Sequence, residues 1–463
     1  MSKSPKSNPM QYSDIDLGFN QSMVSKGSLD VVKKLQRAGY DGYLVGGCVR
    51  DLILGTAPKD FDVTTNATPE EVKAIFHRGR IIGRRFKIVH VRYGREIVEI
   101  STYRAAPGKP KKNWFGLRKK TSDSQRVLDD NVYGTLDEDV VRRDFTVNAL
   151  YYNPVEESVL DFVEGISDAG SGILRMIGSV PVRFGEDPVH MLRVVRFKAK
   201  LSLTLVDEVE HEIRPNVVLL GEVPPARLFD EVLKLFHHAH GVRSWEELKK
   251  YSILDLLFPL TMKSFDIETE VDYEKLVLDA LGNTDRRINQ GKPVIPAFLF
   301  AALLWAPFKR EYEAIISSGS PLGEAMWSAG DRVFEIQNRT VSVPRRVSGP
   351  AIEIWSMQNR LVQRRPRTID RLLENRRFRA AYDFLLLRAQ CGEVDTEVAQ
   401  WWTDIQECDS DGRRAMIDGL RDGFSKSSRR AKSKNGVASD PGANSTRRKR
   451  PRNRRSKKSV GKQ

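Results

Sequence analysis

Strand-like patterns are confined to the first half of this 463-residue chain. Alternating apolar residues at 87–93 and 97–103 flank Gly94, which is typical of a β-hairpin. After about Arg183 these patterns give way to helical spacing, as in 188–201 and 377–390. The sequence therefore predicts an α+β fold. We expect a head with a small mixed β-sheet and helices, followed by an all-α neck and body.

Composition and pattern together divide the chain into five expected segments. Polar residues dominate both ends, and the helical patterns fall into an earlier and a later group. We expect a flexible N-terminus at 1–27, a mixed head at 28–175, a helical neck at 176–240, a helical body at 241–424 and a disordered basic tail at 425–463.

The formal net charge of +15 is concentrated in the tail. Residues 425–463 contain 15 Lys and Arg and one acid, Asp440, so the rest of the chain is nearly neutral. A segment with so few apolar residues cannot bury enough surface to offset the entropy cost of ordering it. The tail therefore predicts a polyanionic partner, nucleic acid first and an anionic membrane surface second. A merely solubilising tail is the alternative.

The remaining composition indicates a soluble protein of a reducing compartment. Three cysteines are too few for a disulfide framework. The longest apolar run, 294–305, is too short to cross a bilayer, so we expect no transmembrane segment. The first residues lack the apolar core of a secretory signal. We expect a cytoplasmic location.

Two acidic residues stand in a predicted strand at 61–64 and just before it. Because alternate residues of a strand share a face, Asp60 and Asp62 would point together out of the sheet, while Phe61 and Val63 enter the core. Two like charges at that spacing are unfavourable unless a cation neutralises them. Hard oxygen ligands favour Mg²⁺ bridged to substrate phosphates. The alternative is a surface strand that happens to be acidic.

A glycine pair precedes the acidic pair by about thirteen residues. Gly46 and Gly47 follow a short strand and open a helix, where backbone N–H groups can approach phosphate oxygens and Arg50 adds a cation. The alternative is an ordinary tight strand-to-helix turn. A third carboxylate, Glu99, lies in the predicted strand 97–103, either at the metal or facing solvent. Together these residues predict a nucleoside triphosphate held beside its metal.

Three motifs carry a family resemblance. Residues 44–72, LVGGCVRDLILGTAPKDFDVTTNATPEEV, resemble the DNA polymerase beta-like nucleotidyltransferase superfamily, and more narrowly its class of CCA-adding enzymes and bacterial poly(A) polymerases. Residues 141–150 and 186–201 agree with this class. Within the class, residues 83–91, the insertion at 105–130 and the basic extension resemble the bacterial poly(A) polymerases.

The resemblance implies a set of site residues. Asp60 and Asp62 would bind two Mg²⁺ ions, with Glu99 as the third carboxylate of the site and ATP as substrate. It also implies a catalytic role for Asp144, which from sequence could equally be a structural acid paired with Arg142 or Arg143. The expected phosphate and ribose ligands are Gly46, Gly47, Arg50, Arg143 and Asn148.

In this class, side chains of a helical Glu-Asp-x-x-Arg motif select the incoming base. Asp187 is present here, but His190 stands where the class usually carries arginine. Because histidine offers fewer donors, and these depend on its protonation, discrimination against CTP is open and the pocket is expected to be pH-sensitive. Arg193 and Arg196 match the class and would contact phosphate or brace Asp187. An amphipathic helix with solvated charges is the alternative.

Several basic segments point to single-stranded RNA. Residues 104–120 contain seven Lys and Arg with Trp114 and Phe115 among them, and clusters at 364–367 and 376–379 continue into the body. Each could instead be a solvated face. We expect template-independent addition of AMP to RNA 3′ ends, in mRNA processing and RNA degradation, with RNA-decay machinery as a possible partner. The alternatives are a CCA-adding enzyme and a non-catalytic RNA-binding protein on a transferase scaffold.

Overall fold

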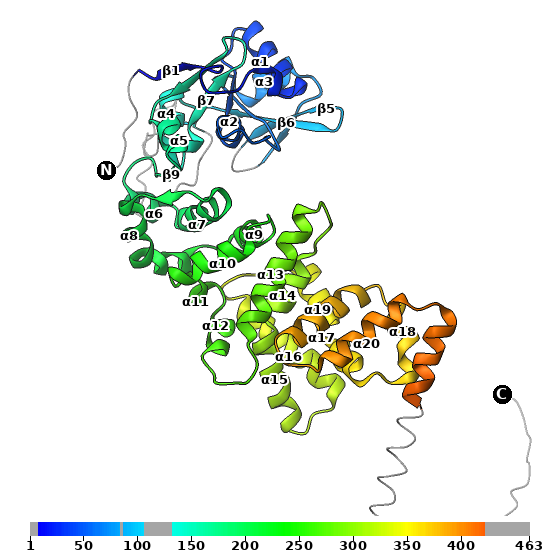
Figure 1. The fold of residues 1–463 in the computed structure, drawn as a ribbon. Coiled ribbons are helices and arrows are strands. Elements are labelled where there is room, and N and C mark those ends of the chain that lie inside the picture. Colours follow the sequence, from blue (N-terminus) through cyan, green and yellow to red (C-terminus); the bar gives the residue numbers. More distant parts are fainter. Residues whose placement is uncertain (1–7, 84–86, 106–131, 422–463) are drawn as a thin grey trace, which may run out of the picture.

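The computed structural model describes residues 8–83, 87–105 and 132–421. In Figure 1 a sheet-containing head lies at one end, a bundle of helices at the other, and green helices of the neck between them. This is the α+β architecture that the change of pattern predicts. The basic tail at 425–463 and nearly all of the insertion at 105–130 lie outside the described residues.

An eight-stranded mixed sheet organises the head. Its strand order is β1-β8-β7-β2-β3-β6-β5-β4. The pairing of β3 with β6 is parallel, and all other neighbours are antiparallel. The strands are β1 (Met10–Ser13), β2 (Tyr43–Val45), β3 (Asp62–Thr65), β4 (Arg80–Ile82), β5 (Ile88–Tyr93), β6 (Glu96–Thr102), β7 (Leu150–Asn153) and β8 (Ser158–Asp161).

Short helices between the strands cover the sheet and are defined by local signals. In α3 the Thr68 hydroxyl accepts from the Glu71 N–H, while the Glu71 carboxylate accepts from the Thr68 N–H, a reciprocal capping box followed by Pro69. The apolar face of α1 is fully buried at Val31, Val32 and Leu35. The head helices are α1 (Lys26–Arg37), α2 (Gly47–Ile53), α3 (Pro69–Ile75), α4 (Leu136–Arg142) and α5 (Gly165–Gly170), with 3-10 turns η1 (Gln21–Met23) and η2 (Thr146–Asn148).

Two expectations about the head need correction. Residues 1–27 were expected to be flexible, but Met10–Ser13 form an edge strand on β8, and the Tyr152 hydroxyl donates to the buried Asp14 at 2.6 Å. Edge pairing and a buried acid therefore order this polar segment although it carries little hydrophobic pattern. The apolar residues of 145–153 also predict one continuous strand, yet η2 interrupts it and only Leu150–Asn153 joins the sheet.

The neck is helical except for a two-residue strand. In a small second sheet, β9 (Ile173–Leu174) pairs in parallel with β10 (Thr204–Leu205), so the neck is not wholly α-helical as expected. This short pairing holds β9, the last strand of the head, against the segment that follows α7. The neck elements are α6 (Val180–Glu186), α7 (Val189–Leu201), α8 (Asp207–Asn216), η3 (Val217–Glu222) and α9 (Pro225–Phe236).

The body is built entirely of helices over its described residues. Its long helices pack their apolar faces together, with Trp355 fully buried and stacked on Phe308 at a centroid distance of 4.2 Å. The helices are α10 (Gly241–Lys250), α11 (Ile253–Leu257), α12 (Pro259–Phe265), α13 (Tyr273–Asn289), α14 (Pro296–Leu303), α15 (Trp305–Ser317), α16 (Leu322–Gln337), α17 (Arg345–Gln363), η4 (Pro366–Thr368), α18 (Ile369–Leu373), α19 (Phe378–Gln390) and α20 (Thr396–Glu407).

One hydrophobic cluster runs from the end of the head through the neck into the body. It begins with Phe145, Val147 and Met176 and continues through the buried faces of α7 and α9. A separate cluster between the sheet and α1 and α3 stabilises the rest of the head. The neck is therefore held firmly against the last part of the head, which fixes α7 relative to the sheet. Within the described residues, every helix is too short or too polar to span a membrane.

Candidate active site

The acidic pair lies at the centre of the sheet. Asp62 is the first residue of β3 and Asp60 comes just before the strand. In the register, Asp62 is opposite Glu99 on β6 and opposite Val45 on β2. Val45 immediately precedes the glycine pair, so the sheet itself places Asp62 between the third carboxylate and the glycine turn.

The electrostatics of Asp62 indicate a site that lacks a positive charge. Burial, and then the neighbouring Glu99 carboxylate, raise the pKa of Asp62 to about 6, while Arg143 opposes the shift and Asp60 adds to it. Neither Asp60 nor Asp62 forms an ion pair with any residue in the described part of the chain. A divalent cation would relieve this repulsion, so these residues fit a Mg²⁺ site.

The protein groups would not complete such a site without substrate. Among residues 8–83, 87–105 and 132–421, no three His, Cys, Asp or Glu side chains are arranged to hold a metal ion. Magnesium is commonly bound by one or two carboxylates together with substrate phosphates. The two-carboxylate arrangement is therefore suited to a metal that arrives with a triphosphate.

Glu99 is next to Asp62 but has a second partner. Its Oε1 lies 3.1 Å from Nε2 of His90 on β5, and the Glu99 side chain is half exposed. The antiparallel register places His90 directly opposite Glu99. Sequence reasoning assigned no role to His90, because nothing in the local pattern separates it from other strand residues.

Two guanidinium groups approach the glycine turn. Gly46 adopts φ 79°, a left-handed conformation that favours glycine, and Gly47 begins α2. A Cβ added at Gly46 would lie 3.7 Å from Nη1 of Arg143, and one at Gly47 would lie 3.4 Å from Nη2 of Arg50. The turn thus requires glycine for its backbone, and it also carries positive charge on both sides.

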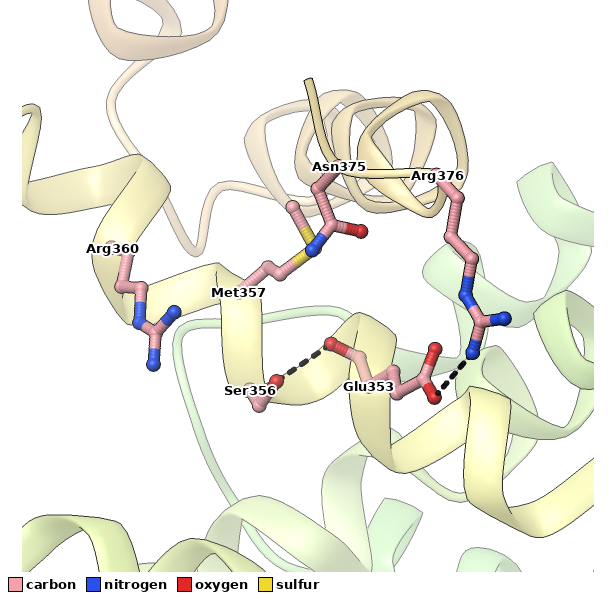
Figure 2. Close-up of a pocket in the computed structure, with 6 residues that line it drawn as sticks. All are labelled: Glu353, Ser356, Met357, Arg360, Asn375 and Arg376. Atoms are coloured by element: carbon pink, nitrogen blue, oxygen red, sulfur yellow. Dashed lines mark hydrogen bonds and ion pairs between the residues drawn. The ribbon is translucent and has the colours of Figure 1, made fainter. Parts of the chain in front are cut away.

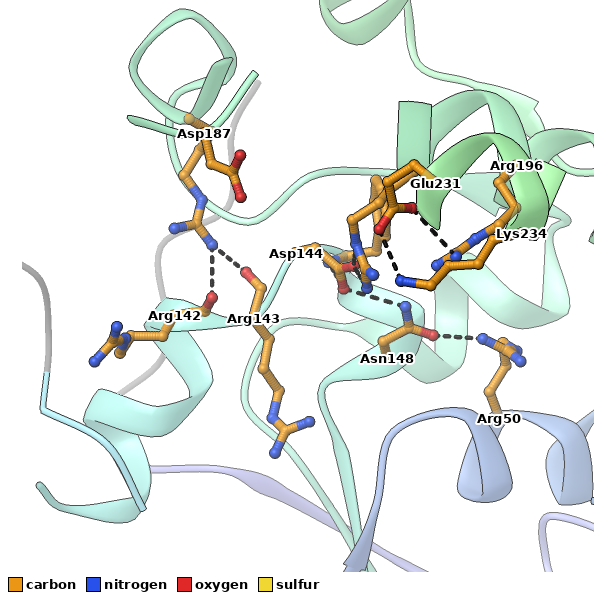
Figure 3. Close-up of polar contacts among 12 residues, drawn as sticks. Arg50, Arg142, Arg143, Asp144, Asn148, Asp187, Arg196, Glu231 and Lys234 are labelled. Atoms are coloured by element: carbon orange, nitrogen blue, oxygen red, sulfur yellow. Dashed lines mark hydrogen bonds and ion pairs between the residues drawn. The ribbon is translucent and has the colours of Figure 1, made fainter. Parts of the chain in front are cut away.

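A buried chain of hydrogen bonds connects this turn to the neck (Figure 3). Arg50, only 2% exposed, donates from Nη1 to Oδ1 of Asn148 at 2.5 Å and from Nη2 to Asp51 at 2.6 Å. The Asn148 amide donates to Oδ1 of Asp144 at 3.1 Å. Arg193 of α7 donates from Nε to Oδ2 of Asp144 at 2.8 Å. Four predicted site residues therefore form one network.

Within this network Asp144 is a fully paired anion. Burial alone would raise its pKa, but the Arg193 guanidinium and the Asn148 amide lower the pKa of Asp144 to about 2. Its partners are thus Arg193 and Asn148, rather than the Arg142 or Arg143 that sequence reasoning considered. Both carboxylate oxygens are engaged, which points to positioning of α7. A catalytic role for Asp144 stays a prediction.

Arg143 is held on the opposite side of the turn. Its Nη2 lies 2.8 Å from Oδ2 of Asp139, and its Nε donates to the Tyr151 hydroxyl at 2.8 Å. The Tyr151 hydroxyl in turn donates to Asp139 at 2.9 Å. These contacts fix the side chain while its charge still acts on Asp62. Asp139 and Tyr151 were missed by sequence reasoning.

The expected base-selecting residues lie at the junction of α6 and α7. Asp187 is the C-cap of α6 and accepts from the Val189 N–H at 3.2 Å, so it precedes the helix on which we expected it. His190 is largely buried, and its Nδ1 lies 3.2 Å from the Arg183 carbonyl oxygen. Burial lowers the pKa of His190, although Asp187 opposes that shift. The lowered pKa favours the neutral form of His190.

Asp187 has an arginine partner that sequence reasoning missed. Arg227 of α9 donates from Nη2 to Oδ2 of Asp187 at 2.6 Å, and both side chains are partly exposed. The same helix supplies Glu231, whose carboxylate lies 3.5 Å from Nη1 of Arg196. Asp187 and Arg227 are separated by forty positions in the sequence, so no local sequence pattern could predict that they pair.

The basic segments are only partly within the described residues. Residues 106–120 of the aromatic-containing segment lie outside them, as do residues 84–86 of the poly(A) polymerase-like strand motif. The clusters at 364–367 and 376–379 are described, and most of their arginines are exposed. RNA contact by any of these segments stays a prediction.

Three family models match the chain. The poly(A) polymerase head domain matches residues 42–175, a probable RNA- and SrmB-binding site of polymerase A matches 202–264, and a polymerase A arginine-rich C-terminus matches 318–457. The first of these ranges contains the acidic pair, Glu99 and the glycine turn. The second contains Arg227, and the third contains the arginine clusters of the body.

Similar proteins distinguish the two branches of the class. Poly(A) polymerase I of Haemophilus influenzae is 41% identical, with 85% of this chain and 87% of that protein covered. A CCA-adding enzyme of Lactobacillus helveticus is 35% identical over only 47% of this chain and 52% of its own. The structure of the Thermotoga maritima CCA-adding enzyme complexed with tRNA has a TM-score of 0.55 at 17% identity, covers 85% of each chain, and supports the fold. By sequence likeness across nearly the whole chain, this protein belongs to the poly(A) polymerase family.

Proposed function

We propose that the protein extends RNA 3′ ends with AMP units from ATP, without a template, as a polynucleotide adenylyltransferase. The observation that carries the chemistry is the position of Asp62, between Glu99 and the strand β2, which ends at Val45 directly before Gly46. The likeness to poly(A) polymerase I over most of both chains favours polyadenylation over CCA addition. Within the described residues Asp60 and Asp62 have no ion-pair partner, and this intact acidic pair argues against a non-catalytic RNA-binding protein.

The reaction is a displacement at phosphorus. The 3′-oxygen of the RNA forms a bond to the α-phosphorus of ATP while the bond from that phosphorus to the bridging oxygen of the β-phosphate breaks. Pyrophosphate leaves, and the hydroxyl proton is lost to water. Two Mg²⁺ ions held by Asp60 and Asp62 would acidify the 3′-hydroxyl and neutralise the triphosphate and pyrophosphate. Glu99 adds negative charge on the same side of the sheet.

The remaining residues position the substrate. The Gly46–Gly47 backbone and Arg143 would receive the triphosphate, because Arg143 is fixed beside the turn by Asp139 and Tyr151. Arg50 and Asn148 brace the same turn from inside the head. Arg50 and Asn148 already form a hydrogen bond with each other, so a phosphate or ribose that contacts either residue must share that residue with its present partner.

Base selection is assigned to the junction of α6 and α7. Asp187 would accept from the adenine N6 amino group, and Arg227 holds its carboxylate in place. In a neutral His190 the Nδ1–H donates to the Arg183 carbonyl oxygen, which leaves Nε2 as an acceptor suited to the adenine N6 amino group rather than to N1. Arg193 and Arg196 hold α7 through Asp144 and Glu231, so their role is to position this helix.

The partners and location follow from this activity as further proposals. RNA 3′ ends are the acceptor, and a cytoplasmic enzyme of this kind would act with RNA-decay machinery on messenger and other transcripts. The five segments proposed from sequence would divide the work between a catalytic head, a base-selecting neck, and a body and tail that bind RNA.

A nucleotide-selectivity assay tests this function. The full-length protein is incubated with an unstructured RNA, Mg²⁺ and one nucleoside triphosphate at a time. Polyadenylation predicts long ladders with ATP and little extension with CTP, GTP or UTP. Extension restricted to tRNA, with a stop after three additions, would instead establish a CCA-adding enzyme. If the protein shows no Mg²⁺-dependent turnover of ATP with any RNA, the result would support the alternative of a non-catalytic RNA-binding protein.

A further inference from the structure

A cavity of about 470 Å³ opens in the helical body, and all of its lining residues lie outside the head. It lies between α17 and the turn that joins α18 to α19 (Figure 2). From α17 it is lined by Glu353, Ser356, Met357 and Arg360, and from the turn by Asn375 and Arg376. The spacing of the first four residues places them on one face of α17. The volume is within the range that holds a small organic group such as one nucleotide.

The wall of this cavity is cationic although it contains one acid. Glu353 accepts from Nη2 of Arg376 at 3.3 Å and from Nε of Arg377 at 3.0 Å, so its charge is more than balanced. The Arg360 guanidinium has no carboxylate partner in the described part of the chain. The cavity and its edge therefore carry an excess of positive charge, which is suited to an anion.

The rest of the lining is suited to a base. Met357 is only 3% exposed, so just the edge of its side chain reaches the opening; in Figure 2 the side chain extends from α17 toward Asn375. A thioether is polarizable and packs well against aromatic rings. The side-chain oxygen Oδ1 of Asn375 accepts from the backbone N–H of Arg377 at 2.8 Å. The side-chain NH₂ of Asn375 is therefore left to donate. An apolar floor, an amide donor and guanidinium groups are thus gathered at one opening.

The positive charge continues beyond the cavity. The helix α17 ends at Arg364, which lies over the Trp401 ring at 5.8 Å, and Arg365 and Arg367 beyond it are exposed. A strand of RNA offers regularly spaced phosphates to such a surface, together with bases that stack on aromatic and other flat groups. One arginine would be enough to bind a single small anion, so the row of arginines favours a strand of RNA as the ligand.

We propose that this cavity is a nucleotide subsite for the single-stranded RNA acceptor, upstream of the 3′ end. Arg360 and Arg376 lie at opposite ends of the cavity, so each would bind a different phosphate of the strand, and the base between them would lie at the opening over Met357, within reach of the Asn375 amide. The RNA backbone would continue along Arg364, Arg365 and Arg367. This inference rests on the proposed function, because it takes RNA as the acceptor.

Primer length provides the test. The full-length protein and its Arg360→Gln and Arg376→Gln variants are compared on oligoadenylate primers of about 4 and about 30 nucleotides, with saturating ATP. Arg339→Gln is the matched control, because Arg339 is an exposed arginine after α16 and only 3.9 Å from Glu335. We expect both variants to bind the long primer several-fold more weakly and to retain wild-type KM for ATP. The slope of log affinity against log salt should fall by about 0.7 for Arg360→Gln.

Photocrosslinking distinguishes a direct subsite from a general charge effect. An RNA with 4-thiouridine at successive upstream positions should crosslink to peptides containing Met357 or Asn375 at one or two positions only. The inference is overturned by long-primer affinities equal to wild type, by an equal defect on the short primer, or by crosslinks that avoid these peptides. Loss of binding to anionic phospholipid vesicles with unchanged RNA affinity would overturn it in favour of a membrane surface. If the proposed function itself fails, the wild-type protein extends neither primer, which is a different result.

Discussion

Arg193 of the neck helix α7 donates from Nε to Oδ2 of Asp144 in the head at 2.8 Å. Asp144 also accepts from Asn148, which accepts from Arg50 beside the glycine turn. The segment expected to hold the triphosphate is thus joined by four polar side chains to the helix expected to read the base. A displacement of either Arg50 or Arg193 would therefore disturb the hydrogen bonds at the other end of the network, because buried polar networks tolerate few alternative geometries.

Replacing Asp144 should destabilise the protein in a pH-dependent way. The pKa of Asp144 is about 2 in the folded protein and near 3.9 when unfolded. The lower folded pKa means that the ion pair stabilises the protein above pH 4 and is lost as the pH falls toward 2. We expect Asp144→Asn to lower the free energy of unfolding by about 2 kcal/mol at pH 7. Urea unfolding measures this, and an equal effect of Asp331→Asn, an exposed control on α16, would contradict it.

Replacing Asp62 should have the opposite effect on stability when no divalent ion is present. The pKa of Asp62 is raised to about 6, so ionisation costs stability above that pH and costs nothing below pH 4. We expect Asp62→Asn to raise the urea midpoint at pH 8 and to leave it unchanged near pH 4. Mg²⁺ added together with ATP should raise the midpoint of the wild-type protein more than that of the variant. A lower midpoint for Asp62→Asn at pH 8 would show that Asp62 is a structural acid.

Arg227 should affect which nucleotide is used. Without it, Asp187 loses its 2.6 Å partner and its carboxylate is free to turn. We expect Arg227→Ala to reduce the ratio of kcat/KM for ATP to that for CTP by about tenfold. Arg227→Lys should restore part of this ratio, since it keeps one charged donor. Arg243→Ala is the control, because Arg243 is an exposed arginine of α10 that donates to the Ser202 hydroxyl and lies outside the expected base-selecting residues. Equal ratios for all four proteins would exclude a role for Arg227 in selectivity.

His190 should leave nucleotide choice constant across neutral pH. Sequence reasoning expected a pH-sensitive pocket, but burial lowers the pKa of His190 below its ordinary 6.5. The folded protein therefore favours the neutral ring, and protonation of His190 opposes folding as the pH falls. We expect the ratio of ATP to CTP incorporation to be flat between about pH 7.5 and 9, and His190→Gln to preserve it. A step in the wild-type ratio near pH 7 that His190→Gln abolishes would show that the ring ionises there.

Local signals predicted the parts of this structure that local physics determines. The hairpin around Gly94 and the glycine turn before α2 depend on a few adjacent residues, and the structure contains both. Asp60 and Asp62 likewise lie before and at the start of a strand, while their role stays a prediction. In each instance the sequence pattern and the backbone conformation involve the same short segment.

Relationships between distant segments could not be predicted in this way. β1 is polar and joins the sheet only because β8 offers an edge, and Arg227 is recognisable only once α9 is packed near α6. The partner of Asp144 was sought among its neighbours Arg142 and Arg143, but it is 49 residues away on α7. Such pairs depend on tertiary packing, which a single sequence reveals only through resemblance to a family.

The most direct test of the account is AMP incorporation by Asp62→Asn. Purified wild-type protein, Asp62→Asn and Asp16→Asn are compared by extension of a labelled unstructured RNA with ATP and Mg²⁺, after circular dichroism has shown that all three are folded. Asp16 is an exposed acid of the head and serves as the control. We predict that Asp62→Asn loses at least about a thousandfold in rate while Asp16→Asn retains wild-type activity. Substantial extension by folded Asp62→Asn would contradict the assignment of this carboxylate to the catalytic metal site.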